Sequence, residues 1–406
     1  MRGGVIHPIA PLSLRRGVGA TDASGEVQCT FMKRRKFIKN TVTVTAISAV
    51  GGSIVLSKKK QMTSIKHNKD LETIWQEWEK KGGNPTDENG LFLNMDMVGY
   101  EMANFSKVMK WQTSKNEYKP RKNNQTQGTE VVRDDSFLNS KEDMVVMLGH
   151  ATVFIRLAGK QIVIDPLFGN VPVPNVEILS SSKRFSEFPI DPKKLINLDY
   201  ILISHSHYDH CDKSSLKLIQ KQNPNAKILT GLRMQLLMQA WMPKHKIQEA
   251  GWFQKYITDD KIEIIFVPSC HWSNRGLSDA NETLWGGFII KSDSKTIYFS
   301  GDSGYGNGTH FKKIGELFPN IDVAMIGAGA FAPTWFMKYN HQEPSDAVKA
   351  FHDCKAKKLI PFHFGTFDLS DEPLNEPAVV LQHLQKQNKI GADELKIVKF
   401  GEVVLV

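Results

Sequence analysis

The sequence predicts an α/β or α+β sandwich. From residue 144 onward, short apolar runs recur at close intervals, which is the pattern of buried strands. Helical spacing of apolar residues occurs between several of these runs. Strand and helix patterns that alternate along a chain favour sheets that are covered by helices.

The expected elements follow a polar N-terminal third. Strands are expected at residues 144–148, 152–157, 161–164, 200–204, 227–230, 262–267, 285–290, 296–300, 323–326, 358–362, 397–400 and 403–406. Helices are expected between several of these strands, at residues 214–222, 233–240 and 345–352.

Length and charge narrow the function classes. The 406 residues suffice for one large domain or two medium ones, and 41% hydrophobic and 23% charged residues are ordinary for a globular protein. The formal net charge of the whole chain is +9, and residues 1–70 alone carry +10. The remaining 336 residues therefore have a net charge of about −1. A nuclease needs a basic channel, so we expect no nucleic-acid partner.

Residues 1–57 read as a targeting segment. A basic run at residues 33–39 includes Arg34 and Arg35, and the uncharged, largely apolar stretch 41–57 is shorter than a comfortable membrane span. The run resembles the twin-arginine export signal of bacteria. We expect Met32 to be the true start of the protein, and a location in the periplasm or anchored in the membrane and facing the periplasm.

Residues 58–140 are expected to form an extension that packs on a catalytic domain at residues 141–406. Helical spacing at residues 70–80 places four apolar side chains on one stripe, namely Leu71, Ile74, Trp75 and Trp78. Residues 119–135 are rich in Lys, Asn, Gln and Gly and predict a long surface loop.

The segment from Ile203 to His210 reads Ile-Ser-His-Ser-His-Tyr-Asp-His and carries the strongest functional pattern. It follows an expected buried strand, and positions i and i+2 of an extended chain project to the same side, so His205 and His207 can hold one ion together. Asp209 and His210 lie past the turn and can reach a second ion. Imidazole suits zinc, and a mixed set of His and Asp suits a hydrolytic site.

This HxHxDH pattern resembles the signature of the metallo-β-lactamase superfamily. Three further residues, His271, Asp302 and His363, each follow an expected strand. The seven candidate ligands then divide into two groups, with His205, His207 and His271 for one zinc ion and Asp209, His210 and His363 for a second. Asp302 lies between the two groups. Two such ions lie about 3.5–4 Å apart, and zinc lowers the pKa of a bound water to about 7. Such a site hydrolyses its substrate without a protein nucleophile.

The cysteines do not suggest a disulfide scaffold, because the four are far apart and form no CxxC pair. Cys211 and Cys270 each lie beside a proposed ligand histidine. A thiolate ligand and a disulfide between the two are alternatives to the simpler expectation, which is small buried thiols.

A longer series of motifs resembles one family within that superfamily. In order, the chain contains Leu148-Gly149-His150, Asp165-Pro166-Leu167-Phe168, Lys183-Arg184-Phe185, His271-Trp272, Leu284-Trp285-Gly286, Ser300-Gly301-Asp302-Ser303-Gly304 and His363-Phe364-Gly365. Over residues 140–406 this series is similar to the N-acyl-phosphatidylethanolamine-hydrolysing phospholipases D. The resemblance implies a four-layer αββα sandwich, two zinc ions at the open edge between the sheets, a phospholipid phosphodiester as substrate and a membrane surface as partner.

The same resemblance implies roles for further residues. Tyr208 and His341 match positions that contact the substrate phosphate in the family, where they could stabilise the extra charge of a pentacoordinate phosphorus. The alternative roles are structural: Tyr208 would pack on the sheet edge, and His341 would cap the following helix. His150 and Asp165 are expected to orient ligands by hydrogen bonds.

Two rival functions differ from phospholipase D-type hydrolysis. One is a hydrolase of the same fold that acts on a lactone or a small phosphodiester. The other is a non-catalytic, envelope-associated metal-binding protein, which the presence of all seven ligands disfavours. The sequence leaves the oligomeric state open.

Overall fold

The computed structural model describes residues 66–406, apart from 97–104, 125–126, 172–182, 260 and 277. The expected targeting segment at residues 1–57 lies outside these ranges. Within them, no helix is both long enough and apolar enough to cross a membrane.

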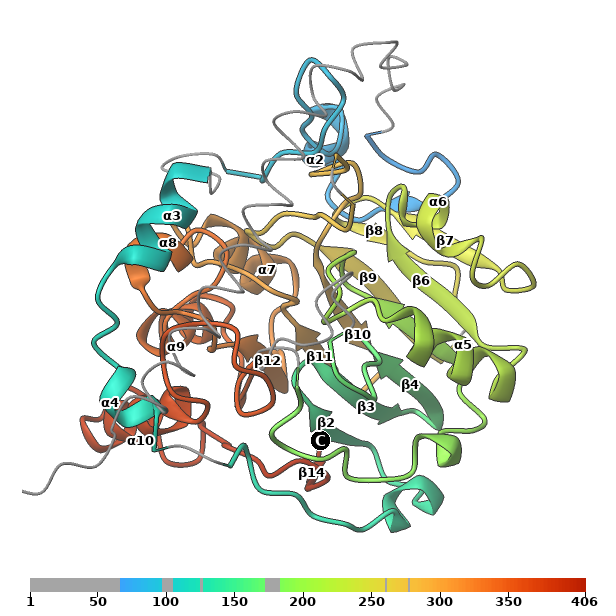
Figure 1. Ribbon diagram of the computed structural model, residues 1–406. Coiled ribbons are helices and arrows are strands. Elements are labelled where there is room, and N and C mark those ends of the chain that lie inside the picture. The colour runs from blue at the N-terminus through green and yellow to red at the C-terminus, as the bar shows by residue number, and fades with distance from the viewer. Residues whose placement is uncertain (1–65, 97–104, 125–126, 172–182, 260, 277) are drawn as a thin grey trace, which may run out of the picture. The chain divides into compact units, whose positions relative to one another are not determined.

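Two sheets form the framework of the described residues (Figure 1). The first has the order β1 (Glu72–Thr73), β8 (Gln254–Lys255), β9 (Glu263–Val267), β10 (Gly287–Lys291), β11 (Thr296–Phe299), β12 (Val323–Gly327), β13 (Leu359–Phe362). The second has the order β14 (Val403–Leu405), β2 (Met144–Gly149), β3 (Thr152–Leu157), β4 (Lys160–Ile164), β5 (Tyr200–Ile203), β6 (Lys227–Gly231), β7 (Ile247–Ala250). Both sheets are mixed, with antiparallel and parallel pairs.

Helices connect and cover the strands (Figure 1). They are α2 (Gln76–Lys80), α3 (Phe105–Thr113), α4 (Lys119–Lys122), α5 (Lys213–Gln222), α6 (Met234–Met238), α7 (Thr309–Leu317), α8 (Thr334–Met337), α9 (Pro344–Asp353) and α10 (Glu376–Lys386), with 3-10 turns η1 (Ser136–Asn139) and η3 (Pro192–Lys194).

Side-chain alternation divides the structure into four layers. Along β9, Ile264 and Phe266 lie in the apolar core between the two sheets, whereas Ile265 and Val267 lie in a second core beneath α7 and α9. A third core joins the outer face of the second sheet to α5 and α6. Strands that are buried on both faces read as continuous apolar runs, which is why the sequence shows them so clearly. The αββα sandwich is therefore confirmed.

Two sequence expectations in the N-terminal extension are wrong in part. Residues 70–80 do not form one helix, because Glu72 and Thr73 pair with β8 as a short strand and only Gln76–Lys80 is helical. Residues 119–135 are not one loop, because Lys119–Lys122 forms α4 and Val131 bridges to Phe400. In both places, pairing with a distant segment overrides the local pattern.

The expected strand at residues 397–400 is also absent as a regular element. Phe400 makes a single bridge to Val131, and the chain then turns at Gly401, whose φ is +86°. This positive φ is easily adopted by glycine and redirects the chain into β14.

The topology brings several strand ends to one edge. β9 and β10 are antiparallel, and so are β10 and β11, so β9 runs in the same direction as β11, β12 and β13. In the other sheet β4 and β5 are parallel. The carboxyl ends of strands that run in one direction meet at one sheet edge, where the following loops can form a site.

Candidate metal centre

The candidate ligands come from loops after these carboxyl ends. His205, His207, Asp209 and His210 follow β5, and His271 follows β9. Asp302 follows β11 and His363 follows β13. Segments that are up to 158 residues apart in the chain therefore supply one group of side chains, all of them largely buried.

Asp165, which follows β4, supports the loop after β5. Its carboxylate accepts hydrogen bonds from the Ser204 backbone N–H (2.8 Å) and hydroxyl (2.6 Å), and from His210 Nδ1 (2.8 Å). Ser204 Oγ in turn accepts a hydrogen bond from the Nδ1–H of His205 (2.9 Å). Asp165 is fully buried, so these bonds compensate its desolvation and orient two histidines at once.

Three imidazole nitrogens converge at the first candidate position. His207 Nδ1 lies 2.9 Å from His205 Nε2 and 3.1 Å from His271 Nε2. Nitrogens that bind one zinc ion tetrahedrally at about 2.0–2.1 Å lie roughly 3.3 Å apart, so this spacing suits one ion. The other nitrogen of His271 donates to the Asn340 carbonyl oxygen (2.9 Å), which leaves Nε2 as the lone-pair donor.

The second candidate position lies on the other side of Asp302. Asp302 Oδ2 is 3.1 Å from both His210 Nε2 and His363 Nε2, and each of these nitrogens is 3.6 Å from Asp209 Oδ2. Asp302 Oδ2 is also 3.9 Å from His205 Nε2 and 3.8 Å from His271 Nε2. One carboxylate oxygen thus faces both groups, which is the position that a bridging ligand needs.

Buried polar atoms without a hydrogen-bond partner support a metal at this place. Among the described residues, Asp302 Oδ1 is such an atom, and His210 Nε2 and His363 Nε2 make no hydrogen bond of regular geometry, although each lies 3.1 Å from Asp302 Oδ2. An orphaned buried donor or acceptor is costly, and a cation would satisfy all three. The residues present therefore fit a metal centre.

The protonation states suit metal binding at the first position. Burial holds the pKa of His205 and of His271 well below the ordinary value, and neighbouring imidazoles lower it further. Burial also lowers the pKa of His207 to about 4. These imidazoles are neutral at pH 7, which is the ligand form.

At the second position, neighbouring groups of opposite charge determine the direction of the pKa shifts. Burial alone would lower the pKa of His363, but the carboxylate of Asp302 raises it to about 9. Burial alone would raise the pKa of Asp302, but His210 and His363 hold it well below its ordinary value. A metal ion that replaces the proton on His363 would keep these carboxylate charges compensated.

The structure places the remaining predicted residues near this centre. His150 Nε2 lies 3.0 Å from Asp209 Oδ2, and together with Asp209, His210 and His363 it forms a group that could hold a metal. His341 is partly buried, with Nδ1 4.0 Å from Asp302 Oδ2. Its side chain makes no cap for α9, which begins after Glu343. The Tyr208 hydroxyl donates to the Arg275 carbonyl oxygen (3.0 Å), so its proton is engaged by the backbone.

The cysteine alternatives find no support. Burial raises the pKa of Cys211 and of Cys270 to about 12, so both are thiols at neutral pH. Both are free, and neither contributes to a metal-binding group of the described residues.

Asn94 is a site residue that the sequence reasoning missed. Its side-chain amide accepts from the His271 backbone N–H (3.0 Å) and donates to the His271 carbonyl oxygen (3.0 Å), which fixes the backbone of that histidine. It lies 177 residues away in the chain, and no local pattern marks it. The N-terminal extension therefore takes part in building the centre.

Arg275 is a second missed residue. Its Nη1 donates to the carbonyl oxygens of Ser206 (3.0 Å) and Cys211 (2.6 Å), at the two ends of the loop that carries His207, Asp209 and His210. Its guanidinium lies 4.1 Å from the ring centre of Tyr208 and 4.8 Å from that of Trp241. Arg275 therefore holds the loop that carries the candidate ligands through its backbone carbonyl oxygens.

Arg275→Ala is expected to weaken metal binding about 10–100-fold, which is the usual cost of losing a residue that orients metal ligands. Arg275→Lys keeps the charge but loses the planar fork, so an intermediate loss is expected. Competition with a chelator measures the affinity. Lys213→Ala is the control, because Lys213 also lies over Trp241 (5.5 Å) but belongs to α5. Equal metal affinity in wild type and Arg275→Ala would contradict this role.

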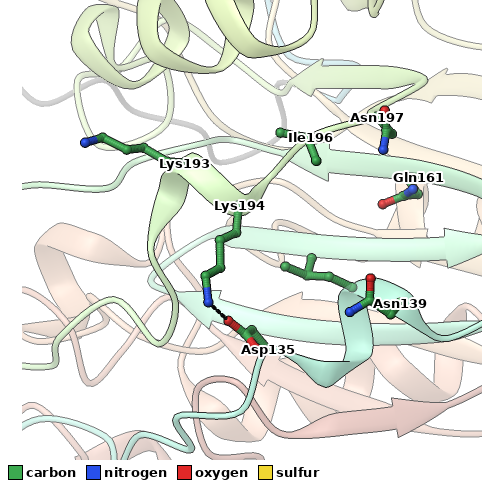
Figure 2. Close-up of a pocket in the computed structure, with 8 residues that line it drawn as sticks. Asp135, Asn139, Gln161, Lys193, Lys194, Ile196 and Asn197 are labelled. Carbon is green, nitrogen blue, oxygen red and sulfur yellow. Dashed lines mark hydrogen bonds and ion pairs between the residues drawn. The ribbon is translucent and has the colours of Figure 1, made fainter.

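A surface hollow of about 410 Å³ elsewhere in the described structure is not part of the centre. Figure 2 shows its residues, which lie in or next to the turns η1 and η3 and in the strand β4, with an ion pair between Lys194 and Asp135. None of its lining residues is a candidate ligand.

Comparisons with known proteins agree with the geometry. The family model described as a beta-lactamase superfamily domain matches residues 160–364, about half of the chain. The chain therefore belongs to the β-lactamase superfamily. It is a metal-dependent hydrolase with the metallo-β-lactamase fold. The structure also matches the isothiocyanate hydrolase from Delia radicum gut bacteria, with a TM-score of 0.52 at 17% identity over 65% of this chain and 98% of the other. At that identity the likeness shows a common fold.

Sequence relatives narrow the family further. The chain is 32% identical over 262 residues to the N-acyl-phosphatidylethanolamine-hydrolyzing phospholipase D 1 of Caenorhabditis elegans, covering 62% of this chain and 72% of that protein. It is 29% identical over 243 residues to the mitochondrial protein of the same activity name from Saccharomyces cerevisiae, covering 58% of this chain and 50% of that one. The resemblance to the phospholipase D family within this superfamily is therefore confirmed.

Proposed function

We propose that the protein is a di-zinc phosphodiesterase that hydrolyses N-acyl-phosphatidylethanolamine in the manner of a phospholipase D. The observation that carries this proposal is the position of Asp302 Oδ2, which faces two separate groups of ligand nitrogens. The similarity to two proteins with this activity name supports the substrate class.

The proposed ligands are the seven residues predicted from the sequence. His205, His207 and His271 would hold one zinc ion, Asp209, His210 and His363 would hold the other, and Asp302 would bridge the two. When bound, two zinc ions would supply a Lewis acid for the phosphoryl oxygens and a water nucleophile at neutral pH.

The bond changes define what the protein must stabilise. A water oxygen bonds to phosphorus, and the bond between phosphorus and the ester oxygen of the N-acylethanolamine group breaks. The products are a phosphatidic acid and an N-acylethanolamine, whose new hydroxyl takes one proton of the water. Negative charge grows on the non-bridging phosphoryl oxygens during this displacement, so donors near them accelerate it.

His341 is the side chain that we propose for this task. It lies beside both ligand groups, with ring centres 5.2 Å from His271 and 5.1 Å from His363, and it stays partly accessible to a substrate. Burial lowers its pKa to about 4, so at neutral pH it is a neutral imidazole with one N–H to donate. Tyr208 would need to release the Arg275 carbonyl oxygen before it could contact a phosphate.

A panel of substrates tests the proposal. Purified protein with measured metal content is incubated with N-acyl-phosphatidylethanolamine, phosphatidylcholine, a small phosphodiester and an acyl lactone. We expect two zinc ions per chain and highest turnover on the first lipid. Turnover of the lactone alone would contradict the proposal and favour a lactone hydrolase of the same fold. If the metal-loaded protein turned over none of the substrates, a non-catalytic metal-binding role would be favoured.

Hydrolysis in oxygen-18 water tests the chemistry separately. We expect the label in the phosphatidic acid, because water attacks phosphorus. Label only in the ethanolamide alcohol would mean cleavage at carbon and would exclude the proposed route.

We also propose that the protein is exported by the twin-arginine pathway. The support is the sequence of residues 33–57, which lies outside the described residues. Replacing Arg34 and Arg35 by Lys is expected to leave folded, active protein in the cytoplasm, as measured by cell fractionation. Replacing Lys58 and Lys59 by Arg is the control and should leave export intact. Wild-type protein found only in the soluble cytoplasm would contradict the proposal.

A further inference from the structure

An aromatic and basic surface lies beside the candidate metal centre. α3 and α8 lie side by side (Figure 1), and the Trp111 ring of α3 stacks on the Phe336 ring of α8, with centres 4.9 Å apart. Lys110 Nζ lies 4.7 Å from the ring centre of Trp335. The Tyr339 ring is approached by Lys107 Nζ at 5.6 Å and by Lys338 Nζ at 5.1 Å.

This surface combines accessible aromatic rings with a local excess of positive charge. Trp335 is 37% exposed, and Lys110 and Lys338 are exposed beside it. Residues 105–113, which form α3, contain Lys107 and Lys110 and no acidic residue. The excess is local, because the chain beyond residue 70 is close to neutral as a whole.

The surface is directly connected to the metal centre. Tyr339 is followed by Asn340, whose carbonyl oxygen accepts the hydrogen bond from His271 Nδ1 (2.9 Å), and then by His341. The His341 backbone N–H donates to the Met337 carbonyl oxygen at the end of α8 (2.9 Å). A molecule docked on α8 therefore lies next to the proposed phosphate-binding residue.

We propose that this aromatic–basic surface, formed by Trp111, Trp335, Tyr339, Lys107, Lys110 and Lys338, docks on bilayers of anionic phospholipid. Trp and Tyr favour the interface between headgroups and hydrocarbon, and Lys side chains are attracted to anionic headgroups. The proposal deepens the proposed function, because docking here would deliver a lipid phosphodiester to the centre.

Vesicle binding tests the surface without any need for turnover. The full chain is sedimented with vesicles of phosphatidylcholine containing phosphatidylglycerol. The double variant Lys110→Glu with Trp335→Ser is expected to bind at least about tenfold more weakly, since it reverses a charge and removes an interfacial aromatic ring. The control is Ile257→Ser with Lys261→Glu, which alters one exposed apolar and one exposed basic residue near β8. Equal binding by both double variants, or equal wild-type binding to purely zwitterionic vesicles, would overturn the proposal.

Hydrogen exchange locates the contact independently of any binding by other parts of the chain. Adding the anionic vesicles is expected to slow amide exchange in residues 105–113 and 334–339, but not in residues 257–262. Unchanged exchange at 105–113, or full protection there before vesicles are added, would overturn the proposal. Turnover of a short-chain, monomeric substrate should be within about twofold of wild type in the surface variant, which separates failed docking from failed chemistry.

Discussion

Asp302→Ala is expected to abolish hydrolysis, with kcat/KM at least about 1,000-fold below wild type. Metal ions supply several kcal/mol of transition-state stabilisation, and each 1.36 kcal/mol corresponds to a factor of ten in rate. Asp302 Oδ2 faces both groups of nitrogens, so its removal disturbs both metal positions at once. We expect the metal content to fall from two ions per chain to one or fewer, as measured by elemental analysis.

The fold should survive this change. Asp302→Asn preserves the shape of the side chain and should lose activity to a similar degree, because an amide is a poor bridging ligand. Asp293→Asn is the control, since Asp293 is an exposed residue in the turn before β11 and should leave metal content and activity unchanged. Two bound zinc ions in a fully active Asp302→Ala protein would disprove the bridging role.

His341→Ala is expected to lower kcat about 100-fold while KM changes by less than about threefold, because a donor to a developing oxyanion acts mainly in the transition state. The variant should keep both metal ions, since the proposed ligand set does not include His341. Steady-state kinetics on loaded protein, together with metal analysis, measures both quantities. His383→Ala, which removes an exposed histidine of α10, is the control and should behave as wild type.

Two results would count against this role of His341. Because His271, Asp302 and His341 could also hold a metal as a group, loss of one zinc ion in His341→Ala would make His341 a ligand instead. A rise in KM with unchanged kcat would mean that His341 binds the ground state and the transition state equally.

Local residue pattern was enough to predict the sandwich and the gathering of the candidate ligands in the loop after β5. The apolar runs at residues 262–267 and 323–326 became β9 and β12 because both of their faces are buried, which leaves a continuous signal in the sequence. His205, His207, Asp209 and His210 lie within six positions after one strand, so their spacing alone places them together. His271, Asp302 and His363 could be added because they too follow strand patterns.

Pairing between distant segments decided the rest. Residues 70–80 carry a helical pattern, but the backbone of Glu72 and Thr73 is taken up by β8, which is more than 180 residues away. Asn94 and Arg275 hold His271 and the ligand loop through backbone groups, and hydrogen bonds to a backbone leave no trace in the residue types of their partners. Periodicity reports which face of an element is buried. The register in which the sheets assemble decides which distant segment covers that face. It also decides which side chain holds a candidate ligand in place.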